Sequence, residues 1–364
     1  MSCKRILFLA MNLGSGGAER QMVTVASLLK NRGYDVEFLC YSEGDFFLNL
    51  LEKQSIPVYW KLENNYFKRM VTIRHFIRHG KYDAVISFLE TPNFLNNFSA
   101  LGGRTWKVIT GERSAQKTTF ESVKNKVFCW FQRFSDVIVC NSENAKNMWV
   151  EHLPKYREKL SVIYNTVTLQ PITSRYINKR DNKLHIVIAA SYQYLKNPIG
   201  LVNALILMTD EERCKLHIDW YGKKEVVLGE ARAYDEAVAL IGRNQLGAII
   251  ELHDNTKDIH DKMNEADMVA LFSRVEGLPN AICEGMTLGK PIVMTKVSDY
   301  KILVDDSNGF LCDWDKPESI KNVLVEASNL SKQQLLDKGK QSKLKANKLF
   351  TEEVVLKSWT NLLE

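Results

Sequence analysis

Residues 267–295 read DMVALFSRVEGLPNAICEGMTLGKPIVMT, and the order of apolar and polar residues in this stretch decides the fold. Asp267 to Phe272 is a short apolar run, which predicts a buried strand. After a polar loop, Asn280 to Leu288 is predicted to be a helix, which Gly289 ends. Pro291 to Thr295 is a second apolar run. Strand, helix and strand in this order predict neighbouring parallel strands of an α/β domain.

The same alternation extends along the whole chain. The other predicted strands are Arg5 to Ala10, Val36 to Cys40, Val58 to Lys61, Ala84 to Phe88, Lys107 to Thr110, Val137 to Cys140, His185 to Ala190, Lys215 to Tyr221 and Ile249 to Leu252. The main predicted helices are Glu19 to Lys30, Leu48 to Lys53, Met70 to His79, Ser331 to Lys348 and Glu352 to Leu362. Residues 165–183 are polar and lack periodicity, which predicts a linker between two parallel-sheet domains.

Composition agrees with a chain that folds as two globular domains. The 364 residues are 45% hydrophobic and 25% charged, as in ordinary globular proteins. The seven cysteines are scattered and form no C-x-x-C pair, which predicts reduced thiols in a cytosolic protein. The apolar run after Lys4 and Arg5 is too short for a signal peptide, so a first buried strand is expected. The sequence has no run of about 20 apolar residues, so no membrane span is predicted.

The charge is unevenly distributed. Residues 1–180 hold 26 Lys and Arg against 15 Asp and Glu, a net charge of +11, and residues 181–364 hold 23 against 28, a net charge of −5. This asymmetry predicts that the first half meets an anionic partner. Ordinary variation of surface charge is the alternative interpretation.

Two glutamates flank the start of the helix predicted in residues 267–295. Glu276 lies on the loop at the carboxyl end of the strand, and Glu284 lies one turn into the helix, eight residues later. The helix N-terminus between them offers N–H groups and a positive dipole end, which suit a phosphate. One carboxylate can accept hydrogen bonds from sugar hydroxyls, and the other can do so from a ribose. Two solvated surface charges would be the alternative.

The run from Glu276 to Pro291 resembles the signature of the family 4 retaining glycosyltransferases, whose paired glutamates are separated by seven residues. Three further segments are similar to parts of that family. Gly14-Ser15-Gly16-Gly17-Ala18-Glu19-Arg20 looks like the N-terminal glycine loop, Ser161 to Thr166 resembles the end of the first domain, and Asn308-Gly309-Phe310-Leu311 matches a late Asn-Gly turn. The resemblance covers most of the chain.

The resemblance implies an α/β fold of the GT-B type, with two Rossmann-like parallel-sheet domains that face each other across a cleft. The implied domains are residues 1–167 with a returning helix at 350–364, a linker at 168–183, and a nucleotide-sugar domain at 184–349. Glu284 would bind the donor ribose, and Glu276 would contact the transferred sugar as a catalytic residue. The donor-binding loop would comprise Gly277, Leu278, Pro279, Asn280 and Ala281, with Gly16 and Gly17 approaching the diphosphate because glycine lacks a side chain and adopts unusual backbone angles.

One position departs from the family pattern. The family carries an Arg and a Lys after the first strand of its second domain, both directed at the diphosphate. Lys196 falls at the lysine position, whereas Ser191 occupies the arginine position. Loss of one cation weakens stabilisation of the leaving group, by analogy with single-donor deletions in other enzymes. Arg20 on the acceptor side is a candidate for the missing charge, and a donor held differently is the alternative.

The implied reaction is displacement at an anomeric carbon with retention of configuration. Lys196 and the helix at Asn280 would stabilise charge on the departing diphosphate. We expect a UDP-sugar rather than a GDP-sugar, no cofactor and no metal. Asp313-Trp314-Asp315 matches a D-x-D pattern but falls late, in a polar turn, and the seven histidines show no metal-ligand spacing along the chain.

The acceptor side is predicted from residues that follow a strand of the first domain. Glu112 can assist an acceptor hydroxyl, and Arg113 can bind an acceptor phosphate; a structural salt bridge in the loop is the alternative. Two basic amphipathic segments, Lys117 to Phe134 and Lys68 to Lys81, suit an anionic membrane surface, although a helix with one face in the core would have the same pattern. No nucleic-acid-reading module is present.

These features predict a cytoplasmic enzyme, peripheral at the inner face of the plasma membrane. Its acceptor would be a lipid-linked glycan in bacterial surface polysaccharide synthesis. Three alternatives remain at this point. They are a nucleotide-sugar epimerase, a phosphorylase on the same fold, and a non-catalytic subunit that binds sugar nucleotides.

Overall fold

The computed structural model describes residues 4–113, 120–174, 182–225 and 231–364. The chain divides into two compact units. The first comprises Met1–Thr166 together with Glu352–Glu364, and the second comprises Val167–Thr351. Each unit is built on its own parallel sheet, as the alternation of strands and helices predicts.

The sheet of the first unit has seven strands in the order β3-β2-β1-β4-β5-β6-β7. The strands are β1 (Arg5–Ala10), β2 (Asp35–Cys40), β3 (Val58–Trp60), β4 (Ala84–Phe88), β5 (Lys107–Glu112), β6 (Val137–Cys140) and β7 (Leu160–Val162). Every neighbouring pair is parallel. The central strand β1 is buried from Ile6 to Ala10, because helices cover both faces of the sheet.

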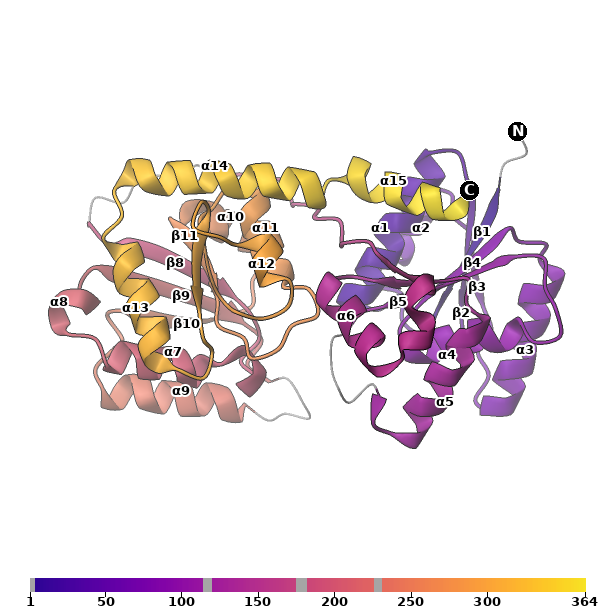
Figure 1. Ribbon diagram of the computed structural model, residues 1–364, viewed down its shortest axis with the longest axis horizontal. Helices are drawn as coiled ribbons and strands as arrows, with labels where there is room; N and C mark the ends of the chain where they lie inside the picture. The colour runs from indigo at the N-terminus through magenta and orange to yellow at the C-terminus, as the bar shows by residue number, and fades with distance from the viewer. Residues whose placement is uncertain (1–3, 114–119, 175–181, 226–230) are drawn as a thin grey trace. The chain divides into compact units, whose positions relative to one another are not determined.

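Seven α-helices of the described residues belong to the first unit. They are α1 (Gly17–Asn31), α2 (Leu48–Lys53), α3 (Tyr66–His79), α4 (Glu90–Ser99), α5 (Val123–Phe131), α6 (Glu143–His152) and α15 (Glu352–Leu363), with 3-10 turns η2 (Gln132–Phe134) and η3 (Pro154–Lys159). Helices α1 and α15 share a core with Phe8 and Phe38. On the other face, α3 and α4 pack with Leu7 and Leu9. Figure 1 shows α15, at the yellow end of the chain, beside α1.

The sheet of the second unit has six strands in the order β10-β9-β8-β11-β12-β13, again parallel throughout. They are β8 (Leu184–Ala189), β9 (Leu216–Gly222), β10 (Ile250–Asp254), β11 (Met268–Leu271), β12 (Ile292–Thr295) and β13 (Gly309–Cys312). The helices are α7 (Pro198–Ile206), α8 (Asp210–Arg213), α9 (Arg232–Arg243), α10 (Ile259–Glu265), α11 (Asn280–Thr287), α12 (Tyr300–Leu303), α13 (Pro317–Ser328) and α14 (Lys332–Leu349), with a 3-10 turn η4 (Tyr194–Lys196).

Gly285 sets the distance between α11 and the sheet. A Cβ atom on Gly285 would lie 2.8 Å from the Cβ of Val269 on β11. A larger side chain would therefore push the helix away from the strand that precedes it. This close packing holds the first turn of α11 at the carboxyl end of β11.

Sequence patterns did not predict several elements, and three of them show why. Helix α4 carries its polar residues inward, with Asn93, Asn96 and Asn97 buried, so it lacks the apolar stripe by which a helix is recognised. Strand β7 is three residues long. Strand β13 begins at Gly309, inside the segment expected to be an Asn-Gly turn. The turn ends at Asn308, whose side-chain amide donates a hydrogen bond to the carbonyl of Leu303.

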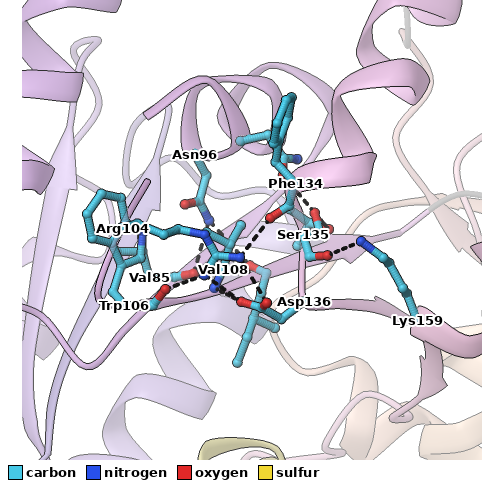
Figure 2. A network of polar contacts seen from close by, with 12 residues as sticks. Val85, Asn96, Arg104, Trp106, Val108, Phe134, Ser135, Asp136 and Lys159 are labelled. Carbon is cyan, nitrogen blue, oxygen red and sulfur yellow. Dashed lines mark hydrogen bonds and ion pairs between the residues drawn. The ribbon is translucent and has the colours of Figure 1, made fainter. Parts of the chain in front are cut away.

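A polar network secures the amino ends of β5 and β6 (Figure 2). The guanidinium of Arg104 donates to both carboxylate oxygens of Asp136, at 2.7 and 2.8 Å, and to the carbonyl of Phe134 at 3.0 Å. Burial alone would raise the pKa of Asp136, but hydrogen bonds from Arg104 and from the N–H of Val108 more than offset this and lower it. Lys159 adds a bond to the Ser135 carbonyl at 2.7 Å. The network lies away from the strands' carboxyl ends and acts structurally.

Candidate functional site

The candidate donor site lies at the carboxyl ends of β8 and β11. These strands are neighbours in the sheet, but the chain continues from β8 to one side and from β11 to the other. Such a switch point leaves a crevice in which parallel sheets bind ligands. Lys196 follows β8 in turn η4, and Glu276 follows β11 on the predicted loop.

The structure brings Lys196 and Glu276 into direct contact. Their Nζ and Oε1 atoms are 2.5 Å apart, and Ser273 Oγ donates to the same Oε1 at 2.6 Å. The side chains of Lys196 and Glu276 are 24% and 11% exposed. The carbonyl of Ser273 accepts a bond from Thr295 on β12 at 2.6 Å, so the end of a third strand holds this cluster.

The first turn of α11 completes this side of the site. The loop carbonyl of Gly277 accepts a hydrogen bond from Ser298 Oγ at 2.5 Å, and Leu278 and Pro279 are buried. Asn280 and Ala281 begin the helix, where backbone N–H groups and the helix dipole favour an anion. The loop therefore presents a helix N-terminus next to Glu276.

Glu284 lies in α11 and has a partner of its own. Its Oε2 is 3.6 Å from Nε2 of His260 on α10, a histidine whose side chain is 8% exposed. Nδ1 of His260 accepts a hydrogen bond from the N–H of Gln170 at 2.9 Å. In the neutral ring, the proton is therefore on Nε2 and faces Glu284. This histidine was not predicted from the sequence, because 24 residues separate it from Glu284 along the chain.

Two further residues of the site, Ser273 and Arg274, were not predicted from the sequence. Ser273 stands directly after an apolar strand, which is the usual position of a site residue in a parallel sheet. The N–H of Arg274 donates to the Leu195 carbonyl at 2.8 Å, so it joins the two loops of the site. Its guanidinium lies 5.1 Å from the ring centre of Trp314. Ser191 lies in the loop after β8, at the position where the family arginine is expected, and adds no charge.

In the first unit, the glycine loop follows β1, which is again a switch point because β1 lies between β2 and β4. Gly16 is the N-cap of α1 with φ −69°, and neither Gly16 nor Gly17 has a positive φ. The expectation of unusual backbone angles at these glycines is wrong, because an extended N-cap suffices to start the helix. A Cβ on Gly17 would meet nothing within 4 Å, so its backbone is open to approach. Arg20 is exposed in the first turn of α1.

Glu112 ends β5 and is buried. Its Oε1 accepts bonds from Asn93 Nδ2 at 3.1 Å and Gln132 Nε2 at 3.2 Å. Burial raises the pKa of Glu112 to about 7, although the Asn93 hydrogen bond opposes the rise and the charge of Glu90 adds to it. A carboxyl with such a pKa exchanges a proton near neutral pH, which suits a general base.

Arg113 has partners other than Glu112. Its guanidinium lies 3.6 Å from the ring centre of Phe88, and it donates to Asn165 Oδ1 at 3.1 Å. Burial lowers the pKa of Arg113 to about 9. Glu112 and Arg113 both line a hollow of about 330 Å³, together with Glu90 and Leu89. Leu89 has φ 74° and ψ 160°, a strained conformation that is found mostly at functional sites. Ser114, next in the predicted acceptor segment, lies outside the described residues.

The two basic segments differ in how they are buried. In α5, Phe128 and Phe131 pack on Phe94, with ring centres 4.6 and 4.7 Å apart, whereas Val123 and Trp130 are 79% and 46% exposed. One face of this helix therefore lies in the core, the membrane contact stays a prediction, and Lys117 lies outside the described residues. Helix α3 exposes two apolar residues, Phe67 at 75% and Val71 at 64%. Within the described residues, no helix has the length and hydropathy to span a membrane.

The late D-x-D sequence takes part in surface ion pairs. Asp313 Oδ1 is 2.9 Å from Lys296 Nζ, and its Oδ2 is 3.2 Å from Lys316 Nζ. Asp313 follows β13. The expectation that transfer needs no metal stays a prediction.

Two family models match the chain and together cover most of it. The model described as Glycosyltransferase Family 4 matches residues 15–170, and the model described as Glycosyl transferases group 1 matches residues 183–329. The first match begins at Ser15, within the glycine loop, and contains Glu112, and the second contains Lys196, Glu276 and Glu284.

Individual proteins agree with these models. An uncharacterised glycosyltransferase of Haemophilus influenzae is 25% identical over 87% of this chain and 88% of its own. The UDP-Gal:α-D-GlcNAc-diphosphoundecaprenol α-1,3-galactosyltransferase of Escherichia coli is 22% identical over 86% of this chain and 85% of its own. The crystal structure of Anabaena HepE in complex with UDP has a TM-score of 0.83, with 18% identity, and covers 99% of both chains. The chain belongs to the family 4 glycosyltransferases of the GT-B type, and it is a glycosyltransferase.

Proposed function

We propose that this enzyme transfers a hexose or N-acetylhexosamine from a UDP-sugar to a lipid-linked glycan, with retention at the anomeric carbon. The observation that carries the donor assignment is the cluster of Lys196, Glu276 and Ser273 beside the start of α11. A cation, a carboxylate and a helix N-terminus provide what a diphosphate joined to a sugar requires.

Each donor-site residue has a role in this proposal. Lys196 and the first-turn amides of α11 stabilise the negative charge that grows on the departing diphosphate. Glu276 accepts hydrogen bonds from the transferred sugar, and Glu284, which His260 orients, accepts them from the ribose. Arg274 is a further candidate, besides Arg20, for the charge absent at Ser191, since its backbone is bonded to the loop that carries Lys196. None of these steps routes through a metal.

Relatives support the choice of donor and acceptor. The E. coli relative is named for a UDP-sugar donor and a diphosphoundecaprenol-linked acceptor, and HepE was crystallised with UDP. On the acceptor side, Glu112 takes the proton of the attacking hydroxyl, and Arg113 binds an acceptor phosphate. The exposed apolar and basic residues of α3 and α5 hold the enzyme at the cytoplasmic face of an anionic membrane.

The test is a transfer assay with synthetic diphospholipid-linked mono- and disaccharides and a panel of UDP- and GDP-sugars. Released nucleotide measures turnover, and the anomeric proton coupling of the product measures its configuration. We expect UDP release that depends on the acceptor and a product with the anomeric configuration of the donor. A product of opposite configuration would overturn retention, and GDP-sugar turnover alone would overturn the choice of base.

A thermal-shift screen separates donor binding from acceptor choice. UDP should raise the melting temperature by mass action, more than GDP or ADP at the same concentration. Glu276→Gln serves as the inactive control for the transfer assay. Stabilisation by UDP without turnover on any lipid-linked acceptor would leave the donor site supported and the acceptor class wrong.

A further inference from the structure

The edge strand β10 of the second unit and its neighbour β9 place a histidine and two carboxylates together on one face. Asp219 lies on β9, and Glu251 and His253 lie on the outermost strand β10. One ligand atom from each of these side chains lies within 4.8 Å of the others. We propose that Asp219, Glu251 and His253 bind a divalent transition metal ion of the Zn²⁺ class.

The register of the two strands produces this cluster. Glu251 is paired with Asp219 across the parallel ladder, and residues two apart on a strand share a face. The local sequences His217-x-Asp219 and Glu251-x-His253 therefore put four metal-binding side chains on the same side. The spacing along the chain concealed this, because 34 residues separate His253 from Asp219.

The side chains already approach metal-binding geometry. His253 Nε2 is 2.7 Å from Asp219 Oδ1 and 3.9 Å from Glu251 Oε2. Ligands of a tetrahedral zinc ion are roughly 3.3 Å apart at metal–ligand distances of about 2.0–2.2 Å. Small side-chain rotations would bring both observed distances to this separation. One nitrogen with two carboxylate oxygens suits Zn²⁺ better than Mg²⁺, which prefers six oxygens.

Two neighbours orient the ligands. His217 Nε2 lies 3.4 Å from Oδ2 of Asp219, the oxygen that does not face His253. The ring of Tyr221 stacks on His253, with centres 4.5 Å apart and an angle of 16° between the planes. Partners of this kind fix ligand orientation and raise metal affinity. The side chains of Asp219, His253 and Glu251 are 18%, 31% and 53% exposed, so an ion can enter from solvent and keep water on its open positions.

This site is separate from the donor site, which lies at the ends of β8, β11 and β12. Its expected effect is on stability, because an ion bound to residues of both strands ties the edge strand β10 to β9. Metal binding at these strands does not depend on the proposed sugar donor or acceptor.

The test is a zinc titration of the full chain. The protein is first freed of metal by chelation, and zinc binding is then measured by competition with a chromophoric chelator. Asp219→Asn and His253→Ala should each weaken binding of one Zn²⁺ equivalent at least tenfold. The matched control changes His75 and His79, an exposed imidazole pair four residues apart on α3, and should leave that equivalent unchanged. Circular dichroism of the metal-free variants confirms folding, and Glu251→Gln provides a milder third variant.

Two readouts decide the outcome. Zn²⁺ should raise the melting temperature of the wild type and of the His75/His79 variant, but not that of His253→Ala. Co²⁺ should give a visible absorption band that Asp219→Asn abolishes. Equal zinc affinity in Asp219→Asn, His253→Ala and wild type would overturn the proposal. Displacement of the zinc by millimolar Mg²⁺ would also overturn it, because it would indicate a cluster of acidic groups without selectivity.

Discussion

The ammonium of Lys196 and the carboxylate of Glu276 are 2.5 Å apart, although 80 residues separate them in the chain. They come from loops after two neighbouring strands of the second sheet. The pair places the cation proposed for the diphosphate beside the carboxylate proposed for the sugar. The bond between sugar and phosphate, which the reaction breaks, would then lie between these two groups.

Replacing Lys196 by Ala should lower kcat for nucleotide release by about 10²–10³-fold, the usual cost of removing one transition-state donor. The physical reason is the loss of the cation that meets charge on the leaving diphosphate. Lys262→Ala is the control, since Lys262 makes a surface ion pair with Glu265 at 3.4 Å. Nucleotide release under saturating donor is the measurement. Equal rates in both variants would contradict the role of Lys196.

Replacing Glu284 by Gln should weaken UDP binding by about tenfold or more, because a hydrogen bond to a charged group contributes about 1.5–3 kcal/mol. His260→Ala should weaken it less, since His260 acts through the orientation of Glu284. Isothermal titration with UDP measures both. The control is Glu265→Gln on α10, whose side chain is 40% exposed. If His260→Ala has the larger effect, the histidine contacts the nucleotide itself.

The pKa of Glu112, raised by burial to about 7, predicts a pH dependence of the rate. As a general base, Glu112 must be ionised, so kcat should rise as pH increases through about 7. Glu112→Gln should lower kcat and remove this step from the profile. Initial rates between pH 5.5 and 8.5 would show it. A profile of unchanged shape in Glu112→Gln would assign the titration to another group.

The same carboxyl predicts that the free energy of unfolding decreases as pH rises, whereas the rate increases. Its folded pKa lies above its ordinary value of 4.5, so the folded state keeps a proton that the unfolded state releases. This contribution is complete below pH 4.5 and is lost as pH rises through about 7. Urea denaturation from pH 5 to 8 should show a decline in wild type that is weaker in Glu112→Gln. A decline of equal size in both proteins would exclude Glu112 as its source.

Replacing Trp359 by Ala should destabilise the first unit by about 3–5 kcal/mol, the usual cost of truncating a large buried ring. Trp359 is 1% exposed and packs on Phe88, with ring centres 6.0 Å apart. The matched control is Trp130→Ala, because Trp130 is 46% exposed. Urea denaturation measures both. A similar loss in the two variants would show that α15 contributes little to this core.

Local patterns in the sequence were sufficient to predict the class of fold and the loop that contains Glu276. Apolar runs of four to seven residues separated by amphipathic helices indicate parallel strands buried on both faces. Pro279 and Gly289 mark the helix between them. These signals act over fewer than about 20 residues, so they can be seen without tertiary structure. Helix α4 was missed because its buried face is polar, and β13 because its turn residues dominate the local pattern.

Tertiary structure alone decided which side chains meet. Strand order brings Lys196 to Glu276 and His253 to Asp219, and helix packing brings His260 to Glu284. It also decided the charge state of Glu112, because the surroundings that bury its carboxyl come from α4 and η2. The physical reason is that apolar periodicity specifies a strand or a helix but not its neighbours. Those depend on how the crossover helices pack, and pKa values depend on the burial that results.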